Sequence, residues 1–213
     1  MKQRTDPALI GVLIYEGVEP IDLGGTVGVV SMARRVLPAV QSVVVAPRAG
    51  PVRLSDGLEV LAPHGVEDLP TCDVVIVCGG PGWPEASRDP ALLAWLRGLR
   101  PEGVASVCTG ALILAAAGVL DGRSATTRRN AVGAEAVAPL SLLGSGVRAV
   151  AASVVDDVVV TSGGVSLAID GTLYLLERLY GPEAVADVAR VIEYDRALAA
   201  NRAGLGVVRL PPR

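Results

Sequence analysis

Apolar runs of strand length alternate along the chain with segments of helical periodicity. The runs predict strands at residues 8–15, 42–46, 58–62, 73–78, 104–107, 147–155 and 158–161. Helices are predicted from about residue 22 to 36, at 90–99, 111–117, 165–179 and 182–200, with an irregular tail over 201–213. Uninterrupted apolar runs are typical of parallel strands covered on both faces. The pattern therefore predicts an α/β fold, a doubly wound and mostly parallel sheet sandwiched by helices.

Composition is consistent with one well-filled domain over residues 1–213, with its core at about 8–195. Of the 213 residues, 51% are hydrophobic and none is Phe, so Val, Leu, Ala and Ile must build the core. The net charge of −3 and the absence of basic clusters longer than Arg128-Arg129 argue against a nucleic-acid partner. No apolar segment approaches the roughly 20 residues of a membrane span, and the N-terminus lacks a signal-peptide pattern. We expect a cytoplasmic protein without membrane contacts.

The three cysteines predict neither a disulfide framework nor a metal site. Cys72, Cys78 and Cys108 are an odd number without CxxC spacing. Cys78 ends an apolar run, which favours packing over reactivity. His64 is the only histidine and lies in a loop-like Pro-His-Gly setting far from Cys108 in sequence, so we interpret it as a surface residue.

Cys108 is the candidate nucleophile. It stands between a predicted strand, residues 104–107, and a helix of strong formers that ends before Gly118. On such a tight turn the side chain projects over the strand ends, and the helix directs free N–H groups and its positive dipole end at the sulfur. The sequence therefore predicts a strained nucleophile elbow that holds a thiolate. The alternative is a small buried hydrophobic residue.

Two further loops follow predicted strands and are expected to meet Cys108 at the ligand-binding edge of the sheet. After the first strand come Glu16, Glu19 and Asp22. Asp22 is the candidate acidic partner, and it is also a candidate helix N-cap. After residue 78 comes Gly79-Gly80-Pro81-Gly82-Trp83, which is either a flexible loop or half of an oxyanion hole, with the Thr109 amide as the other half.

These motifs resemble the ThiJ/PfpI superfamily, which is class I glutamine amidotransferase-like, and within it the isonitrile hydratase branch and related sensor domains of AraC-type regulators. The resemblance spans about residues 8–195. It rests on segments 21–25, 106–111, 118–127, 161–165, 169–170 and 192–195.

The resemblance implies a flavodoxin-like fold, a homodimer, no cofactor and a small-molecule substrate. It implies that Cys108 is the nucleophile and Asp22 its proton-carrying partner. It also implies a polar contact from Thr109, with the Gly80 and Thr109 amides as oxyanion donors. Gly79 and Trp83 would complete the substrate site. For an isonitrile, sulfur would attack the terminal carbon, and water would convert the thioimidate to an N-substituted formamide.

The sequence departs from the family pattern at two points. Family members commonly carry Thr-Thr-His-Trp where this chain has Thr126-Thr127-Arg128-Arg129, and Gly-Pro where it has Gly25-Thr26. Arg128 either faces the pocket, where it would favour a thiolate and bind an anionic substrate, or is a solvated residue at a helix start.

Three other functions compete with hydration of an unsaturated carbon–nitrogen group. Glyoxalase or deglycase chemistry and peptidase-like chemistry usually recruit a histidine, which Arg128 replaces. A small-molecule or redox sensor without turnover is the non-enzymatic alternative. We expect no AraC-type fusion, since the 18 residues after Asp195 cannot hold a DNA-binding helix pair.

Overall fold

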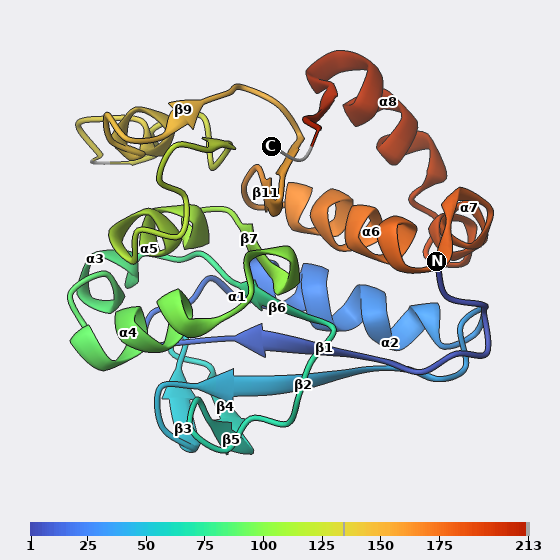
Figure 1. Ribbon diagram of the computed structural model, residues 1–213, viewed down its shortest axis with the longest axis horizontal. Coiled ribbons are helices and arrows are strands. Elements are labelled where there is room, and N and C mark those ends of the chain that lie inside the picture. The colour runs from blue at the N-terminus through green and yellow to red at the C-terminus, as the bar shows by residue number, and fades with distance from the viewer. Residues whose placement is uncertain (134, 212–213) are drawn as a thin grey trace.

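An eight-stranded sheet runs through the centre of the molecule (Figure 1), in a computed structural model that describes residues 1–133 and 135–211. Its strand order is β12-β10-β11-β7-β6-β1-β2-β5, and every neighbouring pair is parallel except β10 and β11. The strands are β1 Ala8–Leu13, β2 Val40–Ala46, β5 His64–Gly65, β6 Val74–Val77, β7 Val104–Val107, β10 Val154–Asp157, β11 Val159–Ser162 and β12 Val207–Arg209. This architecture confirms the predicted doubly wound, mostly parallel sheet.

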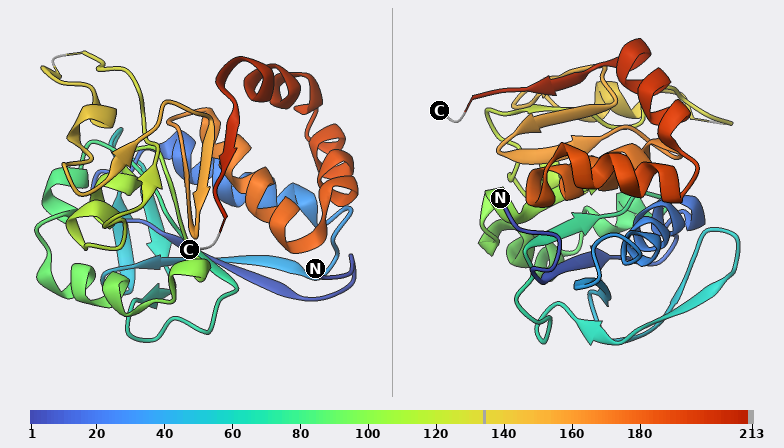
Figure 2. Two further views of the ribbon diagram at one scale, coloured as in Figure 1. Left: turned by 45° about the horizontal axis from the view of Figure 1, so that its top comes forward. Right: turned by 90° about the vertical axis from the view of Figure 1, so that its right-hand side faces the viewer.

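Helices cover both faces of the sheet (Figure 2). One group, α3 to α5, packs together over β6 and β7, and the other, α2, α6 and α7, packs on the opposite side. The helices are α1 Pro20–Leu23, α2 Val29–Ala33, α3 Trp83–Ala86, α4 Pro90–Gly98, α5 Gly110–Ala116, α6 Leu167–Tyr180, α7 Pro182–Val191 and α8 Asp195–Leu205. A π-helix spans Gly24–Gly28, and 3₁₀ turns span Pro101–Gly103 and Pro139–Leu142.

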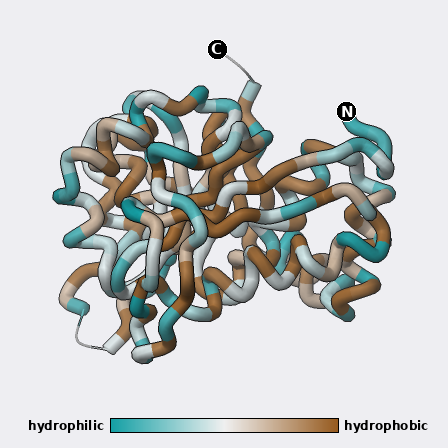
Figure 3. Tube along the Cα trace, turned by 90° about the horizontal axis from the view of Figure 1, so that it is seen from below, coloured by the Kyte–Doolittle hydropathy of each residue, from teal (hydrophilic) through white to brown (hydrophobic). Residues whose placement is uncertain are grey.

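The core is aliphatic, as the absence of Phe requires. Strands β6 and β7 are buried at every position, and Figure 3 shows hydrophobic colour along the central part of the chain trace. The largest fully buried side chains are mostly Leu and Ile. Among the described residues, no helix is both long enough and apolar enough to cross a bilayer.

Two short pairs of strands lie outside the main sheet. Antiparallel β3 Gly50–Arg53 and β4 Glu59–Ala62 form a hairpin around Ser55-Asp56-Gly57, and β4 agrees with the strand predicted at 58–62. The second pair is β8 Ser124–Ala125 with β9 Arg148–Ala149. The predicted strand 147–155 is therefore wrong as one element, since β9 and β10 belong to different sheets. Asp156 and Asp157, which lie between the predicted strands 147–155 and 158–161, belong to β10, and the chain turns at Val158 with φ 68°.

The helix predicted from residue 22 to 36 is three consecutive pieces. The chain is helical from Pro20, winds as a π-helix over Gly24–Gly28, and continues as α2 to Ala33. Asp22 is consequently not an N-cap, because Glu19 holds that position and Asp22 lies in the first turn. Because a π-turn contains more residues than an α-helical turn, α1 and α2 are rotated about the helix axis relative to one continuous α-helix.

The C-terminal predictions also need correction. The predicted helix 182–200 breaks at Ile192–Tyr194, where Glu193 adopts φ 54°, and resumes as α8. The tail expected to be irregular continues α8 to Leu205 and then adds β12 beside β10. Asp170 of α6 anchors the break, because it accepts hydrogen bonds from Tyr194 Oη at 2.8 Å and Asn201 Nδ2 at 3.1 Å. These partners are far apart in sequence, so local pattern could not show them.

Candidate active site

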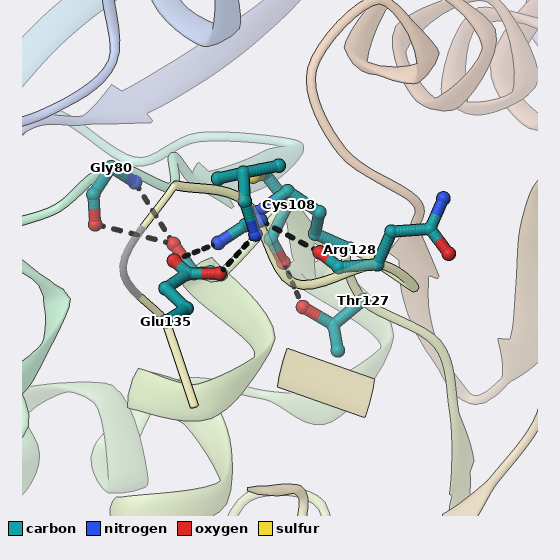
Figure 4. A network of polar contacts seen from close by, with 8 residues as sticks. Gly80, Cys108, Thr127, Arg128 and Glu135 are labelled. Atoms are coloured by element: carbon teal, nitrogen blue, oxygen red, sulfur yellow. Dashed lines mark hydrogen bonds and ion pairs between the residues drawn. The ribbon is translucent and has the colours of Figure 1, made fainter. Parts of the chain in front are cut away.

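Cys108 lies on a strained turn between β7 and α5, as the elbow pattern predicted. Its backbone has φ 53°, a left-handed conformation that is costly for a residue with a Cβ. Two neighbours hold it: the Thr127 hydroxyl donates to the Cys108 carbonyl at 2.6 Å (Figure 4), and the Cys108 amide donates to Gly163 O at 3.2 Å. The turn is therefore fixed by contacts from two other segments.

Two glycines allow the surrounding chain to approach this turn. A Cβ on Gly110 would lie 2.1 Å from Val77 O, so only glycine lets the start of α5 pass the end of β6. A Cβ on Gly164 would lie 2.7 Å from the Cys108 sulfur and 2.8 Å from Arg128 Cβ. Gly164 therefore leaves the space into which the sulfur projects.

The sulfur faces a cavity of about 320 Å³, although Cys108 as a whole is only 3% exposed. The cavity is lined by Glu19, Gly80, Pro81, Trp83, Cys108, Thr109, Arg128, Val132, Glu135 and Val165. A larger cavity of about 520 Å³, between residues 47–49, 65–68 and 89–92, contains no nucleophile. We assign the candidate site to the smaller cavity because reactive groups converge there.

Asp22 is fully buried beside the sulfur and is the acidic group that the structure brings to Cys108. Burial raises the pKa of Asp22 from its ordinary 3.8 to about 7; the charge of Glu19 adds to this rise, while the Cys108 thiol, the Gly79 amide and Arg128 oppose it. Among the described residues, neither carboxylate oxygen has a hydrogen-bond partner at regular geometry. The Asp22 carboxyl is thus free to exchange a proton with the neighbouring sulfur.

The expectation of a resting thiolate is wrong. Burial, followed by the negative charge of Asp22, raises the pKa of Cys108 to about 12, although the Thr109 and Val165 amides favour the anion. Desolvation therefore outweighs the N–H groups at the start of α5, a helix of only seven residues. In this buried pair, desolvation favours the neutral thiol and the neutral carboxyl.

The predicted oxyanion hole is only partly present. The Thr109 amide points at the sulfur, but the Gly80 amide donates to Thr109 Oγ1 at 2.9 Å and is not free. Gly79 acts differently from the prediction, because its amide faces Asp22. The second amide at the sulfur belongs to Val165, which is strained at φ 49°. Sequence reasoning missed Val165, and the preceding Gly163-Gly164 pair was the available signal.

Arg128 faces the cavity, and its alternative as a solvated helix start is wrong because no helix begins there. Its side chain is 12% exposed and forms an ion pair with Glu135. Figure 4 shows the Arg128 side chain beside Cys108, with Glu135 at its end. Burial would lower the pKa of Arg128, but Glu135 and the Cys108 sulfur raise it overall. Sequence reasoning missed Glu135, which carries no motif.

The other predicted residues divide between the site and the scaffold. Trp83 lines the cavity, and so does Glu19, whose carboxylate accepts from Ser55 Oγ at 3.2 Å. Glu16 instead receives the Arg53 amide at 3.3 Å and is not a cavity residue. Cys78 is fully buried, as predicted. His64 lies in β5 rather than a loop, pairs with Asp68 at 3.4 Å and does not line the cavity.

Comparison with known proteins agrees with this geometry. Residues 8–178 match the model of the DJ-1/PfpI family. The chain belongs to this family. It is 35% identical over 189 residues to the isonitrile hydratase of Pseudomonas putida, covering 87% of this chain and 78% of that protein. It is also 28% identical over 200 residues to the HTH-type transcriptional regulator GbdR of Pseudomonas aeruginosa, covering 91% of this chain but only 53% of the regulator.

A crystal structure gives the same assignment for the fold. A ThiJ/PfpI family protein from Pseudomonas syringae superposes with a TM-score of 0.75 at 28% identity, covering 90% of this chain and 76% of that one. Enzymes and regulators thus share this DJ-1/PfpI domain. Membership alone does not choose between them, so the choice rests on the chemistry around Cys108.

Proposed function

We propose that this DJ-1/PfpI protein is an enzyme that hydrates isonitriles to N-substituted formamides through a covalent intermediate on Cys108. The observation that carries the proposal is the Asp22 carboxyl, buried without a regular partner, beside a sulfur that faces a cavity. Similarity to the P. putida isonitrile hydratase over most of both chains supports this substrate class. A buried carboxyl whose pKa is raised to about 7, beside a thiol, is suited to proton transfer at neutral pH, which a ligand sensor does not require.

Each step of the proposed reaction uses a proton carried by Asp22. The Asp22 carboxylate accepts the thiol proton as sulfur bonds to the terminal isonitrile carbon, and it returns that proton to the same carbon, leaving a thioimidate. Water then adds to this carbon, with its proton passing through Asp22 to nitrogen. Cleavage of the C–S bond releases the formamide, and the hydroxyl proton returns to sulfur. One water is consumed, and no oxidant or reductant is required.

The Thr109 and Val165 amides have a defined part in this scheme. Both point at the sulfur, so they stabilise negative charge there when the thiol loses its proton and again when the C–S bond breaks. In this scheme the thiol loses its proton to Asp22 as the C–S bond forms, so no resting thiolate is required. This explains how a thiol with a pKa near 12 can react at neutral pH.

The direct test is formamide release from simple isonitriles, followed by mass spectrometry of the intact protein. We expect cyclohexyl isonitrile to yield N-cyclohexylformamide. In rapidly quenched samples, we expect the protein mass to increase by the mass of the isonitrile, with the adduct on Cys108. Formamide release without any dependence on Cys108, or no turnover of any isonitrile, would contradict the proposal.

The pH dependence of kcat/KM should report Asp22. Because the carboxylate is the base, we expect kcat/KM to fall about tenfold per pH unit below about 7 and to be level from pH 8 to 10. Glu19→Gln provides a matched control, because removing the Glu19 charge should move this acid limb to lower pH without removing it. A limb that stays in place in Glu19→Gln and persists in Asp22→Asn would assign the titration to another group.

A further inference from the structure

The ion pair between Arg128 and Glu135 bears on which substrates the cavity takes. The residues that line the cavity include one cation, Arg128, and two carboxylates, those of Glu19 and Glu135. Its Nη1 donates to Asn130 O at 2.8 Å, and its Nη2 pairs with Glu135. The guanidinium also lies near the Cys108 sulfur, which raises the pKa of Arg128 (Figure 4). A single planar group with five N–H donors thus lies next to both the predicted nucleophile and a carboxylate.

Glu135 reaches this position from an exposed segment. Every described residue between Asn130 and Val137 is exposed and lacks helix or strand structure, whereas Arg128 is mostly buried. Glu135 is held by Arg128 and by the Val132 amide, which donates to its Oε2 at 3.0 Å. Its carboxylate can rotate into solvent about its own side-chain bonds. The Arg128 side chain is only 12% exposed, and its bond to Asn130 O does not involve Glu135.

We propose that Glu135 occupies, in the free protein, the position that a substrate carboxylate takes on Arg128, and that the substrates are isonitriles bearing a carboxylate close to the isonitrile group. The substrate class rests on the proposed function. Exchanging one carboxylate for another leaves the charge at Arg128 unchanged, so the buried guanidinium keeps a partner throughout. The other carboxylate of the cavity, Glu19, accepts from Ser55 Oγ at 3.2 Å.

The position of Arg128 also limits where the carboxylate is carried. The guanidinium lies near the sulfur that bonds to the isonitrile carbon in the proposed reaction (Figure 4). A carboxylate on the carbon attached to the isonitrile nitrogen lies only a few bonds from the reacting atom, and it therefore reaches the same guanidinium. Isocyanoacetate is the simplest molecule of this kind, and its methyl ester is the matched uncharged substrate.

The kinetic test compares kcat/KM for isocyanoacetate with that for methyl isocyanoacetate in four forms of the protein. We expect Arg128→Gln to lower the acid-to-ester ratio by about 10- to 100-fold, the usual effect of losing a charge-assisted pair. Glu135→Gln should raise the ratio at least about threefold, since it removes the competing carboxylate. Arg129→Gln, the neighbouring charge change, should leave the ratio unchanged. Equal losses for acid and ester in Arg128→Gln would overturn the inference.

A binding measurement separates this inference from the proposed function. N-formylglycine is the formamide product of isocyanoacetate, and its binding can be measured by calorimetry without turnover. We expect wild-type protein to bind N-formylglycine more tightly than its methyl ester, and Arg128→Gln to lose this preference while Arg128→Lys retains part of it. If no isonitrile is hydrated but this preference is observed, hydration fails and the anion site stands. If isonitriles are hydrated without the preference, the anion site fails alone.

Discussion

Replacing Cys108 by alanine should lower formamide release by about four orders of magnitude or more, because covalent catalysis by a nucleophile and its base is lost as a unit. Affinity for the formamide product should change little, since the amides, Arg128 and the cavity walls remain. The measurements are steady-state turnover and calorimetry on the same variant. Cys108→Ser is the conservative form, and it should also be inactive because a hydroxyl is far less acidic than a thiol.

Cys78→Ala is the matched control for this experiment. Cys78 is buried at the end of β6 and does not line the cavity, so its replacement should leave the reaction at Cys108 in place. Undiminished turnover in Cys108→Ala would rule out covalent catalysis. Tight ligand binding by wild-type protein without turnover would instead favour a sensor, in line with the similarity to the regulator GbdR.

Replacing Asp22 by asparagine should abolish turnover and yet stabilise the protein at pH 8. The folded state holds the pKa of Asp22 at about 7 against an ordinary 3.8, mainly through burial. A difference of this size corresponds to roughly 4 kcal/mol of folding free energy lost when the carboxyl ionises. Asparagine avoids this cost but buries an amide, so we expect a net gain of about 2 kcal/mol, or roughly 4–8 °C in Tm.

The sign of this effect changes with pH, which makes it specific to Asp22. Because the pKa of Asp22 is higher in the folded than in the unfolded state, its protonation stabilises the fold. This stabilisation is fully present below about pH 3.8 and is lost as the pH rises to about 7. Above 7 the loss is complete. Asparagine should therefore stabilise the protein at pH 8 and give no gain at pH 4, as measured by denaturant unfolding. Parallel stability curves for wild-type and Asp22→Asn protein between pH 4 and 8 would show that Asp22 is not the buried titrating group.

Sequence alone was sufficient for the strand-and-helix alternation and the turn at Cys108, whereas the choice of Asp22 over Glu16 and Glu19 as the acidic partner came from the family resemblance. Those predictions depend on local information: uninterrupted apolar runs specify covered strands, and a strand followed at once by small helix formers specifies a tight turn. Parallel strands also place their carboxyl ends at one edge, so the loops containing Asp22, Gly79 and Cys108 had to meet there. The family resemblance, which rests on short motifs at these loops, pointed to the same fold.

Only the tertiary structure decided the protonation and the charge environment of the site. Burial of Cys108 and Asp22 raises both pKa values, a desolvation effect that depends on what packs around them and not on neighbouring residues in sequence. The pairing of Arg128 with Glu135 and the approach of the Val165 amide likewise arise from segments that fold together. Local pattern therefore determined where the reactive groups lie, while packing determined their ionisation and their partners.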